Sequence, residues 1–334
     1  MRIFVDAMGG DNAPKAIVDG TLEALRNHSQ LSVVLAGDLS QVEPLLKDAA
    51  DVRDRIELVD APEVITNDES PVMGVRTKKK SATVIGMLQL REHQVDGFVS
   101  AGSTGAVLAG GMFRLGRIPG IERPALAPVL PNGINQGSLL IDCGANVDCK
   151  PDYLLQFGLM GSIYMRDCMN IAEPRVGLIN IGVESDKGNA LVKETYPLME
   201  KAPYHFVGNV EAREITNNAA DVLVCDGFSG NLVLKFMEGV AGSLMGIIKK
   251  EIMADTRSKI GALLAKPAFR RVKHAMDYTE VGGAPLLGVQ GAVVKAHGSS
   301  NAHAFACAIR QCIRIIDADV PGTIARGVDG LVQS

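Results

Sequence analysis

The sequence contains no tryptophan, and aromatic residues make up only 4% of its 334 residues. Its six cysteines include no C-x-x-C pair, so neither a zinc ribbon nor a redox pair is indicated. No secretory signal is recognisable at the start, so the cysteines are expected to be reduced thiols of a cytoplasmic protein. The formal net charge of −4 argues against general nucleic-acid binding.

Several motifs of common ligand sites are missing as well. No two glycines are separated by a single residue, so the dinucleotide motif G-x-G-x-x-G does not occur. No glycine directly precedes a lysine, which excludes a P-loop, and there is no H-E-x-x-H zinc motif. The sequence therefore predicts no cofactor and no metal.

Long apolar runs are scarce. The longest uncharged runs are 97–113, which contains five glycines, and 124–141, which contains three prolines. A membrane-spanning helix needs about 20 mostly apolar residues. No membrane-spanning segment is predicted, and both runs fit buried strand-and-loop units better.

The sequence does contain an alternation of short apolar runs with helical stretches. Strands are expected at 3–5, 32–36, 56–59, 97–100, 125–130, 139–141, 175–179 and 222–224. Helical stretches are expected at 15–25, 75–93, 152–168 and 302–317. This order predicts an α/β fold with a mostly parallel, doubly wound sheet, in a single domain over residues 1–334.

One segment differs from the rest in composition. Residues 249–273 contain eight lysines and arginines and only two acidic residues. Apolar residues at helical spacing lie beside basic ones, so 247–280 is expected to be a helical basic segment that could form a protruding tip. The residues expected to contact an anionic membrane or an acidic protein are Arg257, Lys259, Ile260, Leu263, Leu264 and Lys266. Packing on the core or on a dimer partner is the alternative, and Pro267 predicts that the helix is short.

Polar and small residues follow the predicted strands, where ligands bind in such folds. The first loop contains Asp6, Gly9, Gly10 and Asp11, and paired glycines let backbone N–H groups approach an anion. The later loops contain Ser103, Thr104, Asp142 and Asn146. These could bind or orient a phosphate-like anion, or they could be ordinary tight turns, helix caps and Asx turns.

Three further residues are candidates for catalysis. Lys187 lies on a loop after a predicted strand and can reach an anion as a point charge. Asn231 begins a long helix and can donate its amide N–H to an oxyanion, or cap that helix. His297 precedes the helix at 302–317 and titrates near neutral pH, although a loop histidine is more often structural.

Taken together, the loop sequences resemble the PlsX family of bacterial phosphate acyltransferases. The segments that carry the resemblance are 6–14 (DAMGGDNAP), 101–106 (AGSTGA), 142–146 (DCGAN), 180–184 (NIGVE), 187–189 (KGN), 226–231 (DGFSGN) and 295–300 (KAHGSS). They occur in the order found in that family and extend over most of the chain. Each segment alone is modest evidence, but the set is specific.

The resemblance implies that the chain transfers the acyl group of acyl–acyl carrier protein to inorganic phosphate, for fatty acid and phospholipid synthesis. It implies a fold like that of phosphotransacetylases and isocitrate-type dehydrogenases. Lys187 and Asn231 would act at the carbonyl, Ser103, Thr104 and the Gly9–Gly10 amides would hold phosphate, and Asp6, Asp11 and Asp142 would orient the donors. The expected partners are acyl carrier protein, phosphate, a second copy of the chain, an anionic membrane and a downstream membrane glycerol-phosphate acyltransferase.

Two other functions remain open at this point. A short-chain phosphate acetyl- or butyryltransferase would use coenzyme A in place of acyl carrier protein. A peripheral membrane scaffold without catalytic activity would need only the basic segment. Phosphate-dependent release of thiol from each donor would distinguish the three.

Overall fold

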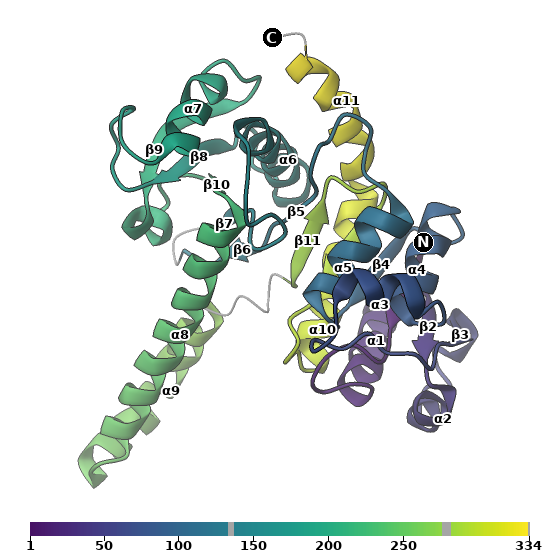
Figure 1. The fold of residues 1–334 in the computed structure, drawn as a ribbon. Coiled ribbons are helices and arrows are strands. Elements are labelled where there is room, and N and C mark those ends of the chain that lie inside the picture. The colour runs from purple at the N-terminus through teal and green to yellow at the C-terminus, as the bar shows by residue number, and fades with distance from the viewer. Residues whose placement is uncertain (133–136, 276–281, 333–334) are drawn as a thin grey trace.

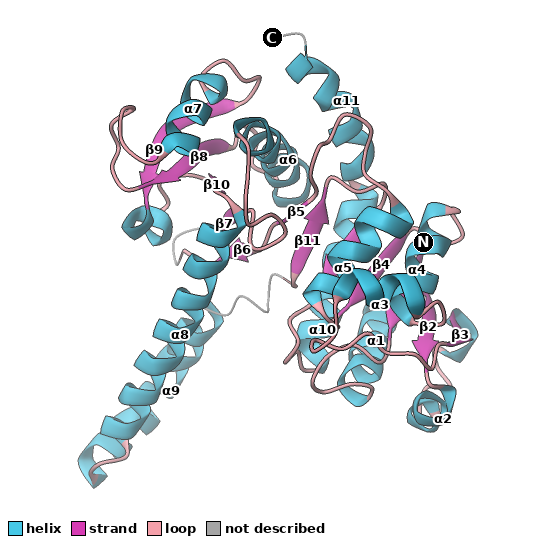
Figure 2. Ribbon diagram, in the orientation of Figure 1, coloured by secondary structure: helices cyan, strands magenta, loops and turns pink. Residues whose placement is uncertain are grey.

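The computed structural model describes residues 1–132, 137–275 and 282–332, which fold around two β-sheets (Figure 1). The first sheet has the strand order β3-β2-β1-β4-β12-β11-β5, and the second has the order β6-β7-β10-β8-β9. Most neighbouring strands are parallel, and helices cover both faces of each sheet (Figure 2). The predicted α/β fold with mostly parallel strands is confirmed.

The first sheet is built around five parallel strands. These are β1 (Arg2–Asp6), β2 (Ser32–Gly37), β3 (Ile56–Asp60), β4 (Gly97–Ser100) and β12 (Ala292–Lys295). An antiparallel extension consists of β11 (Ala284–Leu287) and β5 (Ala125–Leu126). Because the parallel strands all run the same way, their carboxyl ends form one edge of the sheet.

Side chains of β1 alternate between two apolar cores, as the pleat of a strand requires. Ile3 and Val5 pack in the core that also contains residues of α1 (Lys15–Asn27) and α10 (Ala302–Asp317). Phe4 points to the other face and packs with Phe98 and Met87. Three helices lie on that side: α3 (Pro71–Thr77), α4 (Ala82–Arg91) and α5 (Thr104–Gly110).

The second sheet repeats this plan with fewer strands. Its parallel strands are β7 (Ser138–Ile141), β10 (Val222–Val224), β8 (Arg175–Asn180) and β9 (His205–Glu211), with β6 (Val129–Leu130) antiparallel at one edge. The helices around it are α6 (Pro151–Met169), α7 (Ala190–Met199) and α8 (Gly227–Ile252). Helix α11 (Val320–Val332) packs on α6, and one apolar core continues from the first sheet into the second.

The remaining elements are short turns of helix. They are α2 (Leu39–Val42), η1 (Glu43–Leu46), η2 (Arg53–Arg55), η3 (Gly111–Leu115) and η4 (Ala212–Asn217).

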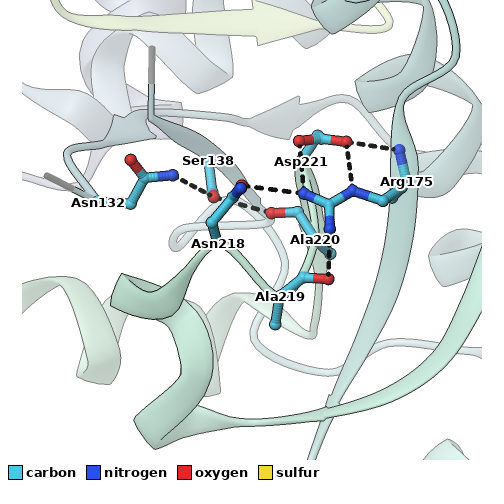
Figure 3. Close-up of polar contacts among 7 residues, drawn as sticks. All are labelled: Asn132, Ser138, Arg175, Asn218, Ala219, Ala220 and Asp221. Atoms are coloured by element: carbon cyan, nitrogen blue, oxygen red, sulfur yellow. Dashed lines mark hydrogen bonds and ion pairs between the residues drawn. The ribbon is translucent and has the colours of Figure 1, made fainter. Parts of the chain in front are cut away.

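Polar contacts join three strands of the second sheet at its amino edge (Figure 3). Arg175, the first residue of β8, donates to both carboxylate oxygens of Asp221, at 3.0 and 3.1 Å. Its guanidinium also donates to Asn218 Oδ1 at 2.9 Å. Ser138, the first residue of β7, donates its hydroxyl to the Ala220 carbonyl at 2.8 Å. Since these contacts fix the amino ends in register, the carboxyl ends of the same strands are also held side by side.

Helices α8 and α9 (Thr256–Ala275) form a hairpin that projects away from both sheets (Figure 1). Apolar side chains of α9 are largely exposed, among them Ile260 at 58%, Leu263 at 69% and Leu264 at 79%. The expected short helix is wrong, because α9 continues through Pro267. The helix is largely exposed, so solvent can replace the hydrogen bond that proline cannot donate. Residues 276–280 of the predicted basic segment lie outside the described residues.

Helix α8 differs from the prediction that no segment is long and apolar enough to span a membrane. Its 26 residues are long and apolar enough to cross a membrane by length and composition, with a mean hydropathy of 1.4 over 18 residues. It does not stand out as an uncharged run in the sequence because Lys235 and Glu238 interrupt the apolar stretch. None of that stretch is buried in the chain, so α8 leaves an apolar surface without a partner in the described structure.

Two element predictions have the wrong extent. The strand expected at 125–130 is two strands in different sheets, β5 and β6, because Pro128 lies between them. The helix expected at 75–93 is two helices, α3 and α4, with Ser81 capping the second: its hydroxyl accepts from the backbone N–H of Val84.

Candidate active site

A cleft of about 820 Å³ lies where the carboxyl ends of strands from both sheets meet. The first sheet contributes loops that follow β1, β4 and β12. The second contributes the loop after β7 and the first turns of α8. The polar and glycine residues that line the cleft are Gly9, Gly10, Asp11, Thr66, Asn67, Asp68, Gly102, Ser103, Thr104, Gly105, Gly144, Asn231, Lys235, Glu238, Gly283, Lys295, His297 and Gly298.

Asp6, Ser100 and Lys295 end three neighbouring strands and lie in register across the sheet. The Asp6 carboxylate accepts from Ser100 Oγ at 2.7 Å and from the Met8 backbone N–H at 3.1 Å. Burial raises the pKa of Asp6, while these hydrogen bonds and the Lys295 charge oppose the increase. Asp6 does not line the cleft, and its observed contacts orient the loops that do.

The glycines allow two loops to pack against each other. A Cβ on Gly9 would lie 2.5 Å from the Gly102 nitrogen, and one on Gly10 would lie 2.9 Å from the Gly298 oxygen. Gly10 also has a φ of +103°, which favours glycine. The loops with Gly10 and Ser103 therefore converge on one crevice, as the sequence predicts. Gly9 lines the same cleft, and the role of the Gly9–Gly10 amides in holding phosphate stays a prediction.

Asp142 and Asn146 organise the loop after β7. The Asp142 carboxylate accepts from the Leu126 and Asn146 backbone N–H groups, at 3.0 and 2.6 Å. Burial raises the pKa of Asp142 to about 6, and these hydrogen bonds oppose the increase. The Asn146 amide donates to Asp142 Oδ2 at 3.0 Å and to the Pro124 carbonyl at 2.8 Å. Both N–H groups of that amide are used inside the loop, and neither residue is among those that line the cleft. These contacts shape the loop, and a direct role of Asp142 and Asn146 in substrate binding stays a prediction.

Asn231 lies in the cleft as expected. It is in the first turns of α8, whose N-cap Asp226 accepts from the Ser229 N–H at 2.8 Å and positions the helix start. Gly144 lines the cleft beside it, and a Cβ on Gly144 would be 3.7 Å from Asn231 Nδ2. The side chain is exposed, so its amide is accessible to a ligand.

Lys187 is not brought into the cleft. It lies on the loop after β8, which is next to β10 at the same edge of the second sheet. Its side chain is exposed and is not among the cleft residues. A catalytic role for Lys187 stays a prediction.

Sequence reasoning gave no role to Lys235, Glu238 or Lys295. Lys235 and Glu238 lie one and two turns after Asn231 on the same face of α8, so helical spacing was a usable signal. Lys235 Nζ lies 2.8 Å from Glu238 Oε2. His297 Nε2 lies 3.9 Å from the other Glu238 oxygen, and burial lowers the pKa of this histidine.

Comparisons with known proteins identify the family of this chain. A family model described as "Fatty acid synthesis protein" matches residues 1–323. The phosphate acyltransferase of Alkaliphilus oremlandii is 49% identical over 333 residues, which cover 99% of this chain and 98% of that protein. The chain belongs to the PlsX family of phosphate acyltransferases. The phosphate acyltransferase of Clostridium tetani is 48% identical over 97% of both chains.

Solved structures support the fold of this phosphate acyltransferase. A phosphotransacetylase from Streptococcus pyogenes aligns with a TM-score of 0.57 at 16% identity, over 98% of this chain and 94% of that one. The EutD phosphotransacetylase from Staphylococcus aureus aligns with a TM-score of 0.58 over the same shares. At this identity the likeness shows the fold alone, and it agrees with the phosphotransacetylase-like fold that the resemblance implied.

Proposed function

We propose that this phosphate acyltransferase moves the acyl group of acyl–acyl carrier protein onto inorganic phosphate, inside the cleft between the two sheets. The observation that carries the proposal is that loops suited to an anion and an amide donor from the other sheet line the same cleft. Loops with Gly10, Ser103 and Thr104 face Asn231 from the opposite sheet. One side suits a phosphate, and the other offers an amide donor to the carbonyl that phosphate attacks.

The chemistry requires positioning more than activation. A phosphate oxygen attacks the thioester carbonyl, and the tetrahedral oxyanion collapses to expel the thiolate and leave an acyl phosphate. Phosphate is already a nucleophile at neutral pH, so no activated serine is needed. Asn231 Nδ2 would donate to the oxyanion, while the phosphate loops hold the nucleophile beside the carbonyl.

An apolar wall of the same cleft suits a fatty acyl chain. Its apolar lining residues are Met8, Val64, Ile65, Leu108, Leu126, Pro128, Val129, Leu130, Cys143 and Leu234. Burying each methylene of a chain against such a wall is worth about 0.8 kcal/mol. This supports a fatty acyl donor over an acetyl donor.

The experiment measures phosphate-dependent thiol release from two donors that carry the same long acyl chain, acyl carrier protein and coenzyme A. The proposal predicts turnover with the carrier protein donor and production of acyl phosphate. Turnover with acyl-coenzyme A alone would select the short-chain transferase alternative. If neither donor released thiol, the alternative of a membrane scaffold without catalytic activity would remain.

Replacing Thr104 with valine tests the phosphate half of the cleft. Thr104→Val keeps the shape and removes a hydroxyl that lines the cleft. The KM for phosphate should rise about 10-fold, which corresponds to a net hydrogen bond of about 1.4 kcal/mol, while the KM for the acyl donor changes little. Steady-state kinetics with each substrate varied in turn measures this, and an equal rise in both KM values would contradict the assignment.

We further propose that the α8–α9 hairpin contacts an anionic membrane surface in the cytoplasm. Exposed Leu263 and Leu264 lie near basic residues, including Arg257, Lys259 and Lys266. Basic side chains are attracted to anionic headgroups, and the leucines would enter the interface. That position would deliver acyl phosphate to a membrane glycerol-phosphate acyltransferase. The chain is proposed to act as a homodimer, for which the apolar surface of α8 is available.

The double variant Leu263→Glu with Leu264→Glu tests the hairpin. We expect it to keep the melting temperature and oligomeric state of the wild type and to lose sedimentation with vesicles that contain anionic lipid. The control variant Leu232→Glu, on the exposed part of α8 near the sheets, should keep vesicle binding at the tip. A lower melting temperature or a monomer, with vesicle binding per folded molecule unchanged, would instead place these leucines in a protein interface.

A further inference from the structure

Lys295 is a buried lysine in the wall of the cleft. It ends β12 and is only 7% exposed. Its ammonium donates to the carbonyl oxygens of Ala101, at 3.4 Å, and Ala296. Because an ammonium has three N–H donors, two backbone carbonyls leave one donor for a ligand.

No carboxylate pairs with this ammonium in the described part of the chain. The acidic residue in register with Lys295 across the sheet is Asp6, which lies two strands away. The oxygens of Asp6 already accept hydrogen bonds from Ser100 and Met8. A buried cation that lacks a bonded counter-ion is costly to the folded protein. An anionic ligand in the cleft would remove that cost.

A second lysine approaches from the other sheet. Lys235 lines the same cleft from α8, where its Nζ lies 2.8 Å from Glu238 Oε2, and its charge still acts on Lys295 to disfavour the ammonium form. Two cations that repel each other across one cleft are both stabilised when a dianion lies between them. Gly10, Ser103 and Thr104 line the cleft on the same side as Lys295 and complete a polar cradle.

We propose that Lys295 is the principal cation of the phosphate site, where it binds a phosphate oxygen through its remaining N–H while Lys235 faces the same anion from α8. The inference rests on the proposed function, in which phosphate is the second substrate. It adds a residue and a specific contact that the sequence motifs did not assign.

Phosphate binding at Lys295 should be coupled to protonation of its side chain. Burial and Lys235 lower the pKa of Lys295 to about 8, whereas Asp6 and Asp11 oppose the decrease, and His297 also lies within electrostatic range. Below this pKa the free protein already carries the ammonium, and above it the lysine is neutral. Since a bound phosphate dianion favours the ammonium, phosphate binding should take up protons at a pH of about 8.5 and should weaken as pH rises further.

The first test titrates inorganic phosphate into the full-length protein and its Lys295→Met variant by calorimetry. Removing one partner of a buried charged contact should weaken phosphate binding about 30-fold or more. The KM for phosphate should rise while the KM for the acyl donor stays near the wild-type value. Lys201→Met, at an exposed lysine outside the cleft, is the matched control and should bind phosphate like the wild type.

The second test uses only the wild-type protein, so it holds even where Lys295→Met fails to fold. Titrations in two buffers of different ionisation enthalpy measure the protons exchanged on phosphate binding. Proton uptake at a pH of about 8.5 supports the proposal. Absence of uptake, or a folded Lys295→Met variant that binds phosphate as tightly as the wild type, would overturn it. A wild-type protein that binds no phosphate would contradict the proposed function itself.

Discussion

Replacing Asn231 with alanine should lower kcat by about 10²–10³-fold while the protein stays folded, because one oxyanion donor is worth about 2.7–4 kcal/mol in the transition state. Asn231 is exposed to the cleft in the first turns of α8, so its truncation leaves no cavity in the core. The KM for both substrates should change less than kcat does, since the contact forms only when the carbonyl becomes tetrahedral. Steady-state kinetics with acyl–acyl carrier protein and phosphate measures both.

Asn217→Ala is the matched control for this experiment. Asn217 is an exposed asparagine in η4, away from the cleft, and its loss should leave kcat near the wild-type value. Near-normal turnover of Asn231→Ala would remove Asn231 from the reaction. Lys187→Ala belongs in the same series: a comparable loss would show that the loop after β8 reaches the cleft during turnover, whereas normal turnover would exclude Lys187.

Replacing Gly230 with alanine should lower both the stability of the protein and its kcat. A Cβ there would lie 1.9 Å from the Asp142 carbonyl oxygen and 2.9 Å from Cys225 Sγ, so the start of α8 must move. We expect Gly230→Ala to lower the free energy of unfolding by about 1–3 kcal/mol, as overpacking typically does. Because Asn231 is the next residue, kcat should also fall. Chemical denaturation and kinetics on the same preparation measure the two effects.

Gly239→Ala, on the same helix, is the control for this overpacking. No atom lies within 4 Å of a Cβ at Gly239 in the described structure. Alanine is favoured over glycine in a helix interior by about 0.5–1 kcal/mol, so this variant should be as stable as the wild type or more so. A Gly230→Ala protein with wild-type stability and activity would show that α8 is not held against the loop after β7.

Much of the fold follows from local sequence signals. The strands β1, β2, β3, β4, β7, β8 and β10 were predicted because each is a short apolar run bounded by turn residues. Strands β9, β11 and β12 were not predicted: Gly208 and Asn209 interrupt the apolar run of β9, and β11 and β12 are four-residue strands containing Pro285 and Lys295. The division into two sheets could not be predicted, since it depends on how β5 and β6 separate at Pro128.

Part of the candidate site could be predicted from the sequence, and part depends on how the loops pack in the folded protein. Loops at strand ends indicated that Gly10, Ser103 and Asn231 would meet, because parallel strands present their carboxyl ends together. The sequence could not show that Asn146 uses both N–H groups of its side-chain amide internally, since this depends on Asp142 and the Pro124 carbonyl being buried acceptors. Lys295 was missed as a ligand group because a lysine at a strand end is usually solvated, and only the register with Ser100 buries it.

The central claim is that phosphate itself attacks the acyl thioester in this cleft. The most direct measurement incubates the enzyme with a long-chain acyl–acyl carrier protein and phosphate labelled with ¹⁸O, then analyses the product by mass spectrometry. The account predicts an acyl phosphate that retains all the label of its phosphate, formed in step with the free thiol of the carrier protein, because the bond broken is carbon–sulfur and the bond formed is carbon–oxygen from phosphate. Release of free fatty acid or thiol at the same rate without phosphate, and no labelled acyl phosphate, would contradict it.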